Sequence, residues 1–258
     1  MKIQLIPSTI DGDGRATSEQ RLTSYVIDDR VAVDGGSLAL GLTERQRQQV
    51  RDVIITHPHM DHVATLPIFI DDLFALLREP VRVHTTQEIA DLLERDVFNW
   101  TVYPRFSGLR NEFGPVMQYV TFRPGEEFEV AHLKVQAVPV NHIVPTVGLV
   151  ATDGRTTIAF SSDTTTTDEF WRVVNETPEV SAVLIEAAFP NALRKLADVS
   201  GHLTPEGLAA ELAKVTHKDL DVLAVHLKPT YRAALVEELK ALGIPRLSVM
   251  EAGRRYEW

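Results

Sequence analysis

The sequence predicts an α/β protein with an αββα sandwich, in which two β-sheets pack together and helices cover their outer faces. Three observations lead to this fold class. Short β-type runs recur in both halves of the chain, helical patterns lie between them, and the two halves resemble each other in this alternation. With 258 residues, 44% of them hydrophobic, the chain can bury a sizeable core, so we expect one domain over residues 1–258.

The first half of the chain contains mainly short strands. Apolar β-type runs in the first 85 residues read KIQLI, SYVID, VAVDGG, DVIIT and VRVHT, separated by turn residues and two helical patterns. Residues 88–98, EIADLLERDVF, have apolar residues at three- and four-residue spacing and are predicted to form a helix. Residues 99–116 break both periodicities with proline, glycine and four aromatic residues, so we expect a functional loop or cover segment.

The second half resumes the strand pattern and then alternates strands with helices. The predicted strands read QYVTF, LKVQAVPV, VGLVAT, TTIAFSS, AVLIEA, VLAVH and RLSVM. Helices are predicted over TPEGLAAELAKV and RAALVEELKAL. Thr204 is the expected N-cap of the first of these helices, with Pro205 at its first position.

Charge and composition limit the partners of the protein. A formal net charge of −10 disfavours binding to long nucleic acids, so any phosphate-bearing substrate needs a local positive centre. The chain has no cysteine, which leaves histidine and carboxylate side chains as metal ligands. No apolar stretch approaches the roughly 18 residues of a membrane span. We therefore expect a cytoplasmic protein without membrane contact.

A dense group of metal-type ligands directly follows the predicted strand DVIIT. The motif contains His57, His59, Asp61 and His62 within six consecutive residues. Alternate residues of an extended chain point the same way, so His57 and His59 can bind one ion while Asp61 and His62 reach a second. Two ions about 3.5–4 Å apart need more ligands than this motif supplies. The remaining ligands must come from elsewhere in the chain.

Three further candidates each follow a β-type run. They are His142, Asp163 and His226, and strand ends converge in space. The carboxylate of Asp163 has two oxygens and can bridge two ions. The predicted assignment gives His57, His59 and His142 to one metal, Asp61, His62 and His226 to the other, and Asp163 to both.

Each of these residues also has a structural interpretation. A lone histidine after a strand, such as His142 or His226, is more often buried and hydrogen-bonded than metal-bound, and the dense motif reverses this expectation. Asp163 could instead cap a turn. His84, His132 and His217 match no metal-ligand pattern and are interpreted as structural or surface residues.

At these residues the sequence resembles the metallo-β-lactamase superfamily, whose T-H-x-H-x-D-H hallmark corresponds to Thr56–His62 here. The run VAVDGGS, with Asp34, resembles an early acidic motif of that superfamily, and the resemblance covers nearly the whole chain. It implies an αββα sandwich of metallo-β-lactamase type and two Zn²⁺ ions, although Mn²⁺ or Fe²⁺ fits the same ligand types.

Further stretches resemble the class II cyclic-nucleotide phosphodiesterases of that superfamily. They are LIEAAFPN, SGHLTPEGLAAEL, VHLKP and DVFNWTVYPRF. The class II signature normally continues after the histidine motif with small residues and Ser-Pro, whereas this chain reads VATLPIFIDDLF, with Asp71 and Asp72. The arrangement of glutamate followed by His-Leu-Thr is also similar to the transfer RNA 3′-processing endonucleases, whose long basic arm has no counterpart here.

The resemblance implies hydrolysis of a small phosphodiester, with cyclic AMP or cyclic GMP as the leading substrates. His202, oriented by Glu186, is the expected general acid that protonates the leaving oxygen. Asp61 is assigned to the catalytic set as well as to the metal. Asp34 is expected to support the metal loop by accepting a hydrogen bond from a ligand imidazole or a backbone group. A turn-forming aspartate before Gly35 and Gly36 is an equally weighted alternative.

Other functions remain open at this point. The alternatives are an RNA 3′-processing nuclease, a hydrolase of a small ester or lactone, and a metal-binding scaffold or sensor without activity. A homodimer is open because relatives with this fold often pair. Four aromatic residues of the cover segment could stack on a purine or pack the segment onto the core: Trp100, Tyr103, Phe106 and Phe113. Phe189 and Asn191 could shape the pocket near Glu186.

Overall fold

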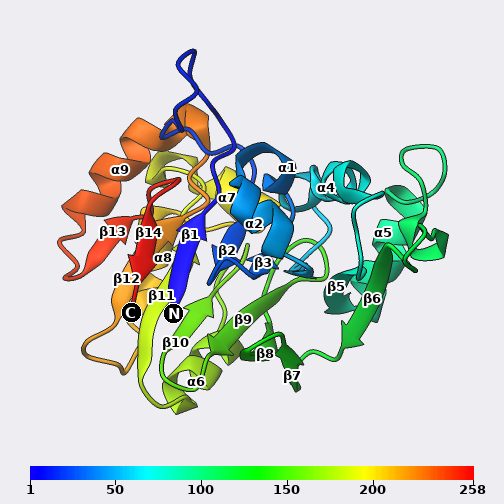
Figure 1. The fold of residues 1–258 in the computed structure, drawn as a ribbon. Helices are drawn as coiled ribbons and strands as arrows, with labels where there is room; N and C mark the ends of the chain where they lie inside the picture. Colours follow the sequence, from blue (N-terminus) through cyan, green and yellow to red (C-terminus); the bar gives the residue numbers. More distant parts are fainter. The chain divides into compact units, whose positions relative to one another are not determined.

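The computed structural model describes residues 1–258, which form two compact units (Figure 1). The N-terminal unit comprises residues 2–123 and 252–257, and the C-terminal unit comprises residues 1, 124–251 and 258. Each unit is built on one seven-stranded mixed sheet. The single-domain expectation stays a prediction.

The N-terminal sheet has the order β14-β1-β2-β3-β4-β5-β6. Neighbours from β14 to β3 are antiparallel, and neighbours from β3 to β6 are parallel. The parallel half therefore directs the carboxyl ends of its strands to one edge. The strands are β1 (Lys2–Leu5), β2 (Tyr25–Ile27), β3 (Val31–Val33), β4 (Asp52–Ile54), β5 (Val81–Thr86), β6 (Met117–Phe122) and β14 (Arg255–Glu257).

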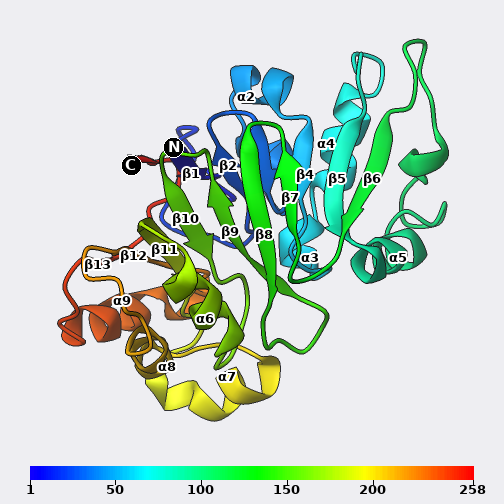
Figure 2. The same cartoon turned by 90° about the horizontal axis from the view of Figure 1, so that it is seen from below.

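The helices of the N-terminal unit follow from local capping and from apolar faces. Thr43 and Gln46 form a capping box at the start of α2, and the Thr86 hydroxyl accepts from Ile89 N (3.2 Å) at the start of α5. Figure 2 shows α4 beside β4 and β5, and its apolar residues belong to the core of this unit. The helices are α1 (Leu38–Gly41), α2 (Glu44–Gln49), α3 (Met60–Val63), α4 (Leu66–Leu73) and α5 (Gln87–Asp96), with a 3₁₀ turn η1 (Phe106–Gly108).

The C-terminal sheet repeats this plan, with the order β13-β12-β11-β10-β9-β8-β7. Neighbours from β7 to β10 are antiparallel, and neighbours from β10 to β13 are parallel. Strands β8, β10, β11 and β12 therefore run in one direction and end at the same edge. The strands are β7 (Glu127–Val130), β8 (Leu133–Pro139), β9 (Val147–Thr152), β10 (Thr157–Phe160), β11 (Val180–Glu186), β12 (Asp221–Val225) and β13 (Leu247–Val249).

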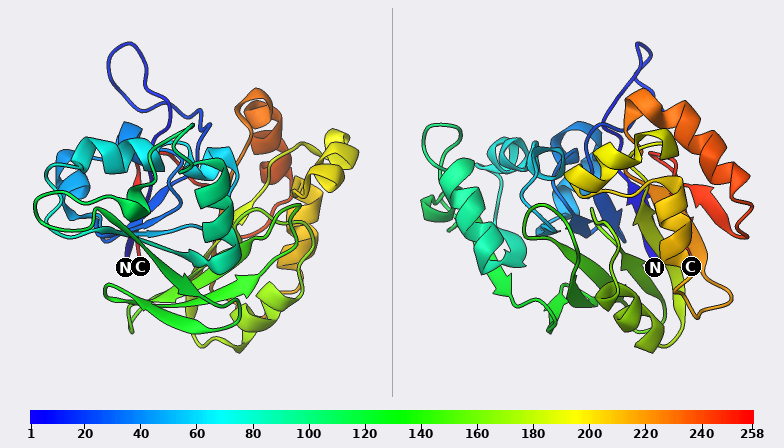
Figure 3. Two further views of the ribbon diagram at one scale, coloured as in Figure 1. Left: turned by 90° about the vertical axis from the view of Figure 1, so that its right-hand side faces the viewer. Right: turned by 180° about the vertical axis from the view of Figure 1, so that it is seen from behind.

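Helices α6, α8 and α9 pack against the C-terminal sheet, and they lie on the same side of it in Figure 2. The predicted cap of α8 is confirmed, because the Thr204 hydroxyl accepts from Gly207 N (3.2 Å) and Pro205 occupies the first position. The helices are α6 (Glu169–Glu176), α7 (Arg194–Ser200), α8 (Pro205–Leu212) and α9 (Arg232–Ala241), with 3₁₀ turns η2 (Asn191–Leu193) and η3 (Pro229–Tyr231). Met1 and Trp258, both of this unit, lie side by side (Figure 3), and the Met1 amino group donates to Trp258 O (2.9 Å).

Two buried carboxylates support the units away from the candidate ligands. In the N-terminal unit, Asp52 accepts two hydrogen bonds from Arg82 (2.7 and 2.8 Å) and one from His84 Nε2 (2.8 Å). In the C-terminal unit, Glu211 accepts from Trp171 Nε1 (2.7 Å) and is paired with Lys214 (2.9 Å). These partners satisfy groups that would otherwise be costly to bury.

The segment 99–116 packs onto the N-terminal core through part of its aromatic cluster. Phe106 is 1% exposed, and its ring lies 6.0 Å from Phe98 and 5.8 Å from Tyr103, centroid to centroid. Stacking on a purine was therefore the wrong alternative for Phe106, because its faces are already covered by the core. Trp100 and Phe113 are 62% and 45% exposed.

Several short elements were not predicted from the sequence, namely β7, β14, α6 and α7. No helix of the structure combines the length and apolar character needed to cross a membrane.

Candidate metal centre

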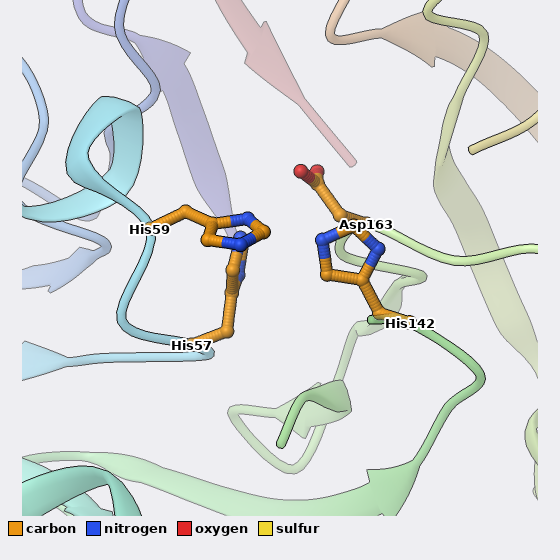
Figure 4. Close-up of side chains that lie close together, drawn as sticks. All are labelled: His57, His59, His142 and Asp163. Carbon is orange, nitrogen blue, oxygen red and sulfur yellow. The ribbon is translucent and has the colours of Figure 1, made fainter. Parts of the chain in front are cut away.

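The N-terminal ligand set lies on the loop that follows β4 and on the first turn of α3. His57 is fully buried, and its ring centroid lies 4.9 Å from that of His59 and 4.0 Å from that of His62. Figure 4 shows the His57 and His59 side chains projecting from this one loop. The predicted convergence of histidines from the dense motif is thus present within this unit.

Asp34 organises this loop from the end of β3. Its side chain is buried and accepts from Thr56 N (2.9 Å), while His62 Nδ1 lies 2.7 Å from its second oxygen. With Nδ1 of His62 engaged by the carboxylate, Nε2 is the ring nitrogen that could coordinate a metal, and such a carboxylate contact is typical of metal-binding histidines. Asp34 also has φ +62° and precedes two glycines. Asp34 therefore fits both interpretations, because it contacts a ligand imidazole and also forms the turn before Gly35 and Gly36.

Backbone contacts hold the same loop from the other side. Thr23 N donates to Asp61 O (2.7 Å), and Gly35 N donates to His62 O (2.6 Å). A Cβ atom on Gly36 would lie 2.0 Å from Asp61 O and 2.7 Å from Thr23 O, so only glycine fits there. The ligand loop is thus fixed by main-chain packing in addition to Asp34.

The C-terminal ligand set lies at the edge where β8, β10, β11 and β12 end. His142 follows β8, Asp163 follows β10 and His226 follows β12. Figure 4 shows His142 and Asp163 with their side chains close together. Asp163 Oδ2 lies 3.3 Å from His226 Nε2, and ligand atoms of Asp163, His202 and His226 all lie within 4.8 Å of one another. The expected grouping of dispersed residues at strand ends is present within this unit.

Glu186, the last residue of β11, joins the loop after β10 to the segment between α7 and α8. Its fully buried carboxylate accepts from Thr164 N (2.8 Å) and Leu203 N (3.1 Å) and pairs with His202 Nδ1 (2.9 Å). Burial lowers the pKa of His202, but the charge of Glu186 and its hydrogen bond outweigh burial and raise that pKa above its ordinary value. The predicted contact between Glu186 and His202 is confirmed.

Three of the nine non-glycine residues with positive φ lie at these strand ends. They begin the loops and are Asp34 (+62°), Ser162 (+56°) and His226 (+60°). Residues in this region cost about 1–3 kcal/mol and persist where the surroundings determine their conformation. The strain is consistent with a functional site at each strand end.

The other residues considered in the sequence have ordinary roles. His84 contacts Asp52, and His217 Nε2 contacts Val174 O (2.9 Å), which confirms their structural interpretation. Asp71 accepts from the Tyr103 hydroxyl (3.2 Å), and Asp72 lies 3.8 Å from Arg47.

Sequence reasoning missed Gly36 and Gly201. His142 Nδ1 lies 2.7 Å from Gly201 O, so Nε2 is the nitrogen of the His142 ring that could coordinate a metal. In the sequence, Gly201 could have been singled out because it directly precedes the candidate residue His202.

The donor set fits a divalent metal. Histidine nitrogens and carboxylate oxygens are ligands of zinc and of neighbouring transition metals, and hydrogen bonds from Nδ1 orient at least two of the rings. The assignment of individual ligands to two metals stays a prediction.

Comparison with known proteins places the chain in a family. Residues 32–226 match the family model described as a Beta-lactamase superfamily domain. The chain is 27% identical over 212 residues to a probable 3′,5′-cyclic-nucleotide phosphodiesterase of Yersinia pestis, a match that covers 72% of this chain and 59% of that protein. The chain therefore spans about three fifths of the length of this relative.

Two solved structures share the fold. The metallo-β-lactamase fold protein YhfI of Bacillus subtilis has a TM-score of 0.76 at 15% identity, with 99% of each chain covered. Yeast PDE1 has a TM-score of 0.78 at 18% identity, with 98% of each chain covered. At these identities the likeness concerns the fold, and the predicted αββα class is confirmed.

Proposed function

The chain belongs to the β-lactamase superfamily, and from this premise we propose that it is a metal-dependent phosphodiesterase that hydrolyses 3′,5′-cyclic nucleotides such as cyclic AMP or cyclic GMP. The observation that carries the proposal is the Glu186–His202 pair beside Asp163 and His226. A scaffold or sensor has no need of a carboxylate-oriented proton donor next to metal-type ligands. The name of the Yersinia pestis relative supports the choice of substrate.

The proposed metal ligands are those expected from the sequence. His57, His59 and His142 would hold one ion, Asp61, His62 and His226 a second, and Asp163 both. Divalent ions there, with zinc as the leading candidate, would neutralise phosphate oxygens and favour ionisation of the attacking water.

The residues of the chain supply the proton and its orientation. The carboxylate of Glu186 holds Nδ1 of His202, so Nε2 can carry the proton that the leaving 3′-oxygen needs. The ring of Phe189 lies 5.8 Å from that of His202, between centroids, and 5.9 Å from that of Tyr231. The Phe189 ring thus lies next to the ring of the proton donor.

The test measures hydrolysis of cyclic AMP, cyclic GMP and bis-p-nitrophenyl phosphate by zinc-loaded protein and by a chelator-treated sample. Turnover of a cyclic nucleotide that is lost on chelation is expected. Cleavage of the activated diester alone would reject cyclic nucleotides as substrates and keep phosphodiester chemistry. Absence of turnover on all three with full zinc occupancy would reject the proposed activity.

His202→Ala separates a proton donor from a metal ligand. As a proton donor, His202 contributes about 10²–10⁴-fold to turnover of a cyclic nucleotide, whereas a nitrophenolate leaving group needs little protonation. The variant should therefore retain zinc and lose far more activity on the cyclic nucleotide than on the activated diester. His217→Ala, which changes a histidine bonded to Val174 O, is the matched control. Zinc loss in His202→Ala would identify His202 as a ligand instead.

A further inference from the structure

Gly201 lies between two functional histidines of the C-terminal unit. It ends helix α7 with φ +75° and ψ +36°, the left-handed conformation that glycine adopts most easily. The N–H of the next residue, His202, donates back to Ala197 O (2.9 Å), so the same helix end sets the direction of both residues. The helix end therefore fixes the backbone of this turn independently of the side-chain contacts of His142 and His202.

The carbonyl of Gly201 holds His142. His142 Nδ1 lies 2.7 Å from Gly201 O, so the ring donates its Nδ1 proton to a main-chain acceptor and presents Nε2 on its other side. One residue later, His202 Nδ1 is held by Glu186 (2.9 Å). The ring centroids of His142 and His202 are 5.0 Å apart. A shift of the Gly201 peptide would thus move the partner of one ring and the backbone of the other.

A side chain at position 201 has no room. A Cβ atom there would lie 2.7 Å from His142 Nδ1 and 3.1 Å from both Ile143 N and Ile143 Cγ2. Gly243 provides a contrast in the same unit, because it follows helix α9 with φ +60° and a Cβ atom there would meet nothing within 4 Å. The two glycines share a conformation and differ in their contact with a candidate ligand.

We propose that Gly201 is a positioning residue that couples metal retention by His142 to proton donation by His202. The inference rests on the proposed function for the role of His202. It assigns no catalytic group to Gly201, which acts through its carbonyl and through the absence of a side chain. Any substitution that keeps the helix end in place must displace the His142 ring or the Gly201 peptide.

The experiment compares Gly201→Ala, Gly201→Asn, Gly243→Ala and Gly243→Asn. Zn²⁺ affinity is measured by competition with a chromophoric chelator, and turnover is measured on cyclic AMP and on bis-p-nitrophenyl phosphate. Both Gly201 variants should lose Zn²⁺ affinity by tenfold or more, and their kcat should fall at least tenfold further on cyclic AMP than on the activated diester. Both Gly243 variants should stay within about twofold of the wild type, although alanine strains the same backbone region.

Asparagine separates conformation from contact, because it tolerates positive φ but carries a Cβ atom. Wild-type Zn²⁺ affinity in Gly201→Asn would attribute the effect to backbone strain and overturn the proposal. Wild-type affinity and an unchanged ratio of the two kcat values in Gly201→Ala would also overturn it.

A measurement on the wild-type protein covers the case in which the Gly201 variants do not fold. Long-range ¹H–¹⁵N correlation spectra should show His142 protonated at Nδ1 in the zinc-loaded protein, with the signal assigned by its loss in His142→Gln. An unprotonated Nδ1 would remove the hydrogen bond to Gly201 O and reject the coupling. If the wild type hydrolyses no phosphodiester, the proposed function fails, while the Zn²⁺ and NMR measurements still decide whether Gly201 positions His142.

Discussion

The two units hold their candidate ligands in contrasting ways. In the N-terminal unit the ligands lie between His57 and His62, whereas in the C-terminal unit they are spread from His142 to His226. The local set is braced by main-chain hydrogen bonds such as Thr23 N to Asp61 O. In the C-terminal unit, Glu186 joins the loop that carries Asp163 to the segment that carries His202. The compact motif is thus held by main-chain hydrogen bonds as well as by the buried carboxylate of Asp34, whereas side-chain acceptance by Glu186 links the dispersed loops.

The buried carboxylates of the two units also differ in what they orient. Asp34 contacts His62, an expected metal ligand, whereas Glu186 contacts His202, the expected proton donor. Loss of Asp34 should therefore act on metal affinity, and loss of Glu186 should act on proton transfer.

The largest effect is expected from Gly36→Ala. The new Cβ would lie 2.0 Å from Asp61 O and 2.7 Å from Thr23 O, both main-chain atoms, so the ligand loop must move as a whole. We expect a loss of about 3 kcal/mol or more of unfolding free energy, measured by urea denaturation. Gly12→Ala, where a Cβ would meet nothing within 4 Å, is the control. Equal stability of the two variants would contradict backbone bracing of the loop.

The next prediction compares substitutions of the two carboxylates, Asp34 and Glu186. Asp34→Asn should weaken zinc binding by about 10–100-fold, since it changes the acceptor that orients His62. Glu186→Gln should keep its zinc and lose about 10²-fold or more of kcat on a cyclic nucleotide, because a neutral amide supports a protonated His202 poorly. Zinc titration and steady-state kinetics check both variants. A loss of zinc affinity in Glu186→Gln as large as that in Asp34→Asn would contradict the separate roles of the two carboxylates.

A smaller difference between the two units is expected in their stability at acid pH. Burial raises the pKa of Asp52, but hydrogen bonds from Arg82 and His84 outweigh burial and hold that pKa well below its ordinary range. A carboxyl with a lowered folded-state pKa stabilises the protein above its unfolded-state pKa of about 3.9, and this contribution is lost as the pH falls toward the folded-state value. We therefore expect the unfolding free energy of the N-terminal unit to decline below about pH 5.

Asp52→Asn should remove about 1–3 kcal/mol at pH 7 and flatten this decline. In the C-terminal unit, burial raises the pKa of Asp221, while Arg246 and Trp258 lower it to a net value below the ordinary one. Asp221 is half-buried, so Asp221→Asn should cost under about 1 kcal/mol. Hydrogen exchange followed by mass spectrometry between pH 3 and pH 7 distinguishes the units. Identical acid responses of the two variants would show that Asp52 does not set the difference.

The smallest effect is expected at the surface. Arg172 pairs with Glu169 and Glu176 on α6, and all three side chains are at least half exposed. Arg172→Ala should leave both the unfolding free energy and the zinc affinity close to those of the wild type, because exposed ion pairs contribute little. A larger change would mean that surface pairs, and not the buried carboxylates alone, distinguish the units.

The same contrast explains what could be predicted from the sequence. The histidine motif is visible because its ligands are neighbours in the chain, and the fold class is visible because strands and helices carry strong apolar periodicity. His142, Asp163 and His226 were found because each follows a β-type run. Their convergence is shown within the C-terminal unit for Asp163 and His226, and the division of ligands between two metals stays a prediction.

The rest depends on contacts between residues distant in sequence. Strand β14 has three residues, Arg255–Glu257, and becomes a strand through pairing with β1. Gly36 and Gly201 look like ordinary turn residues until the atoms around them are known. Phe106 is an aromatic residue of an irregular segment by sequence and a core residue by packing. No local pattern encodes these roles.

The different sequence separations of the two ligand sets have a consequence for the order of assembly. The N-terminal histidines are joined by a chain of six residues, so bringing them together costs little loop-closure entropy. The C-terminal ligands enclose 85 residues from His142 to His226 and converge only after β8, β9, β10, β11 and β12 have paired. Contacts of long range form late and slowly during folding. A nascent chain would therefore bring His57, His59 and His62 together early, whereas the dispersed residues His142, Asp163 and His226 would come together as a late step in the folding of their own unit.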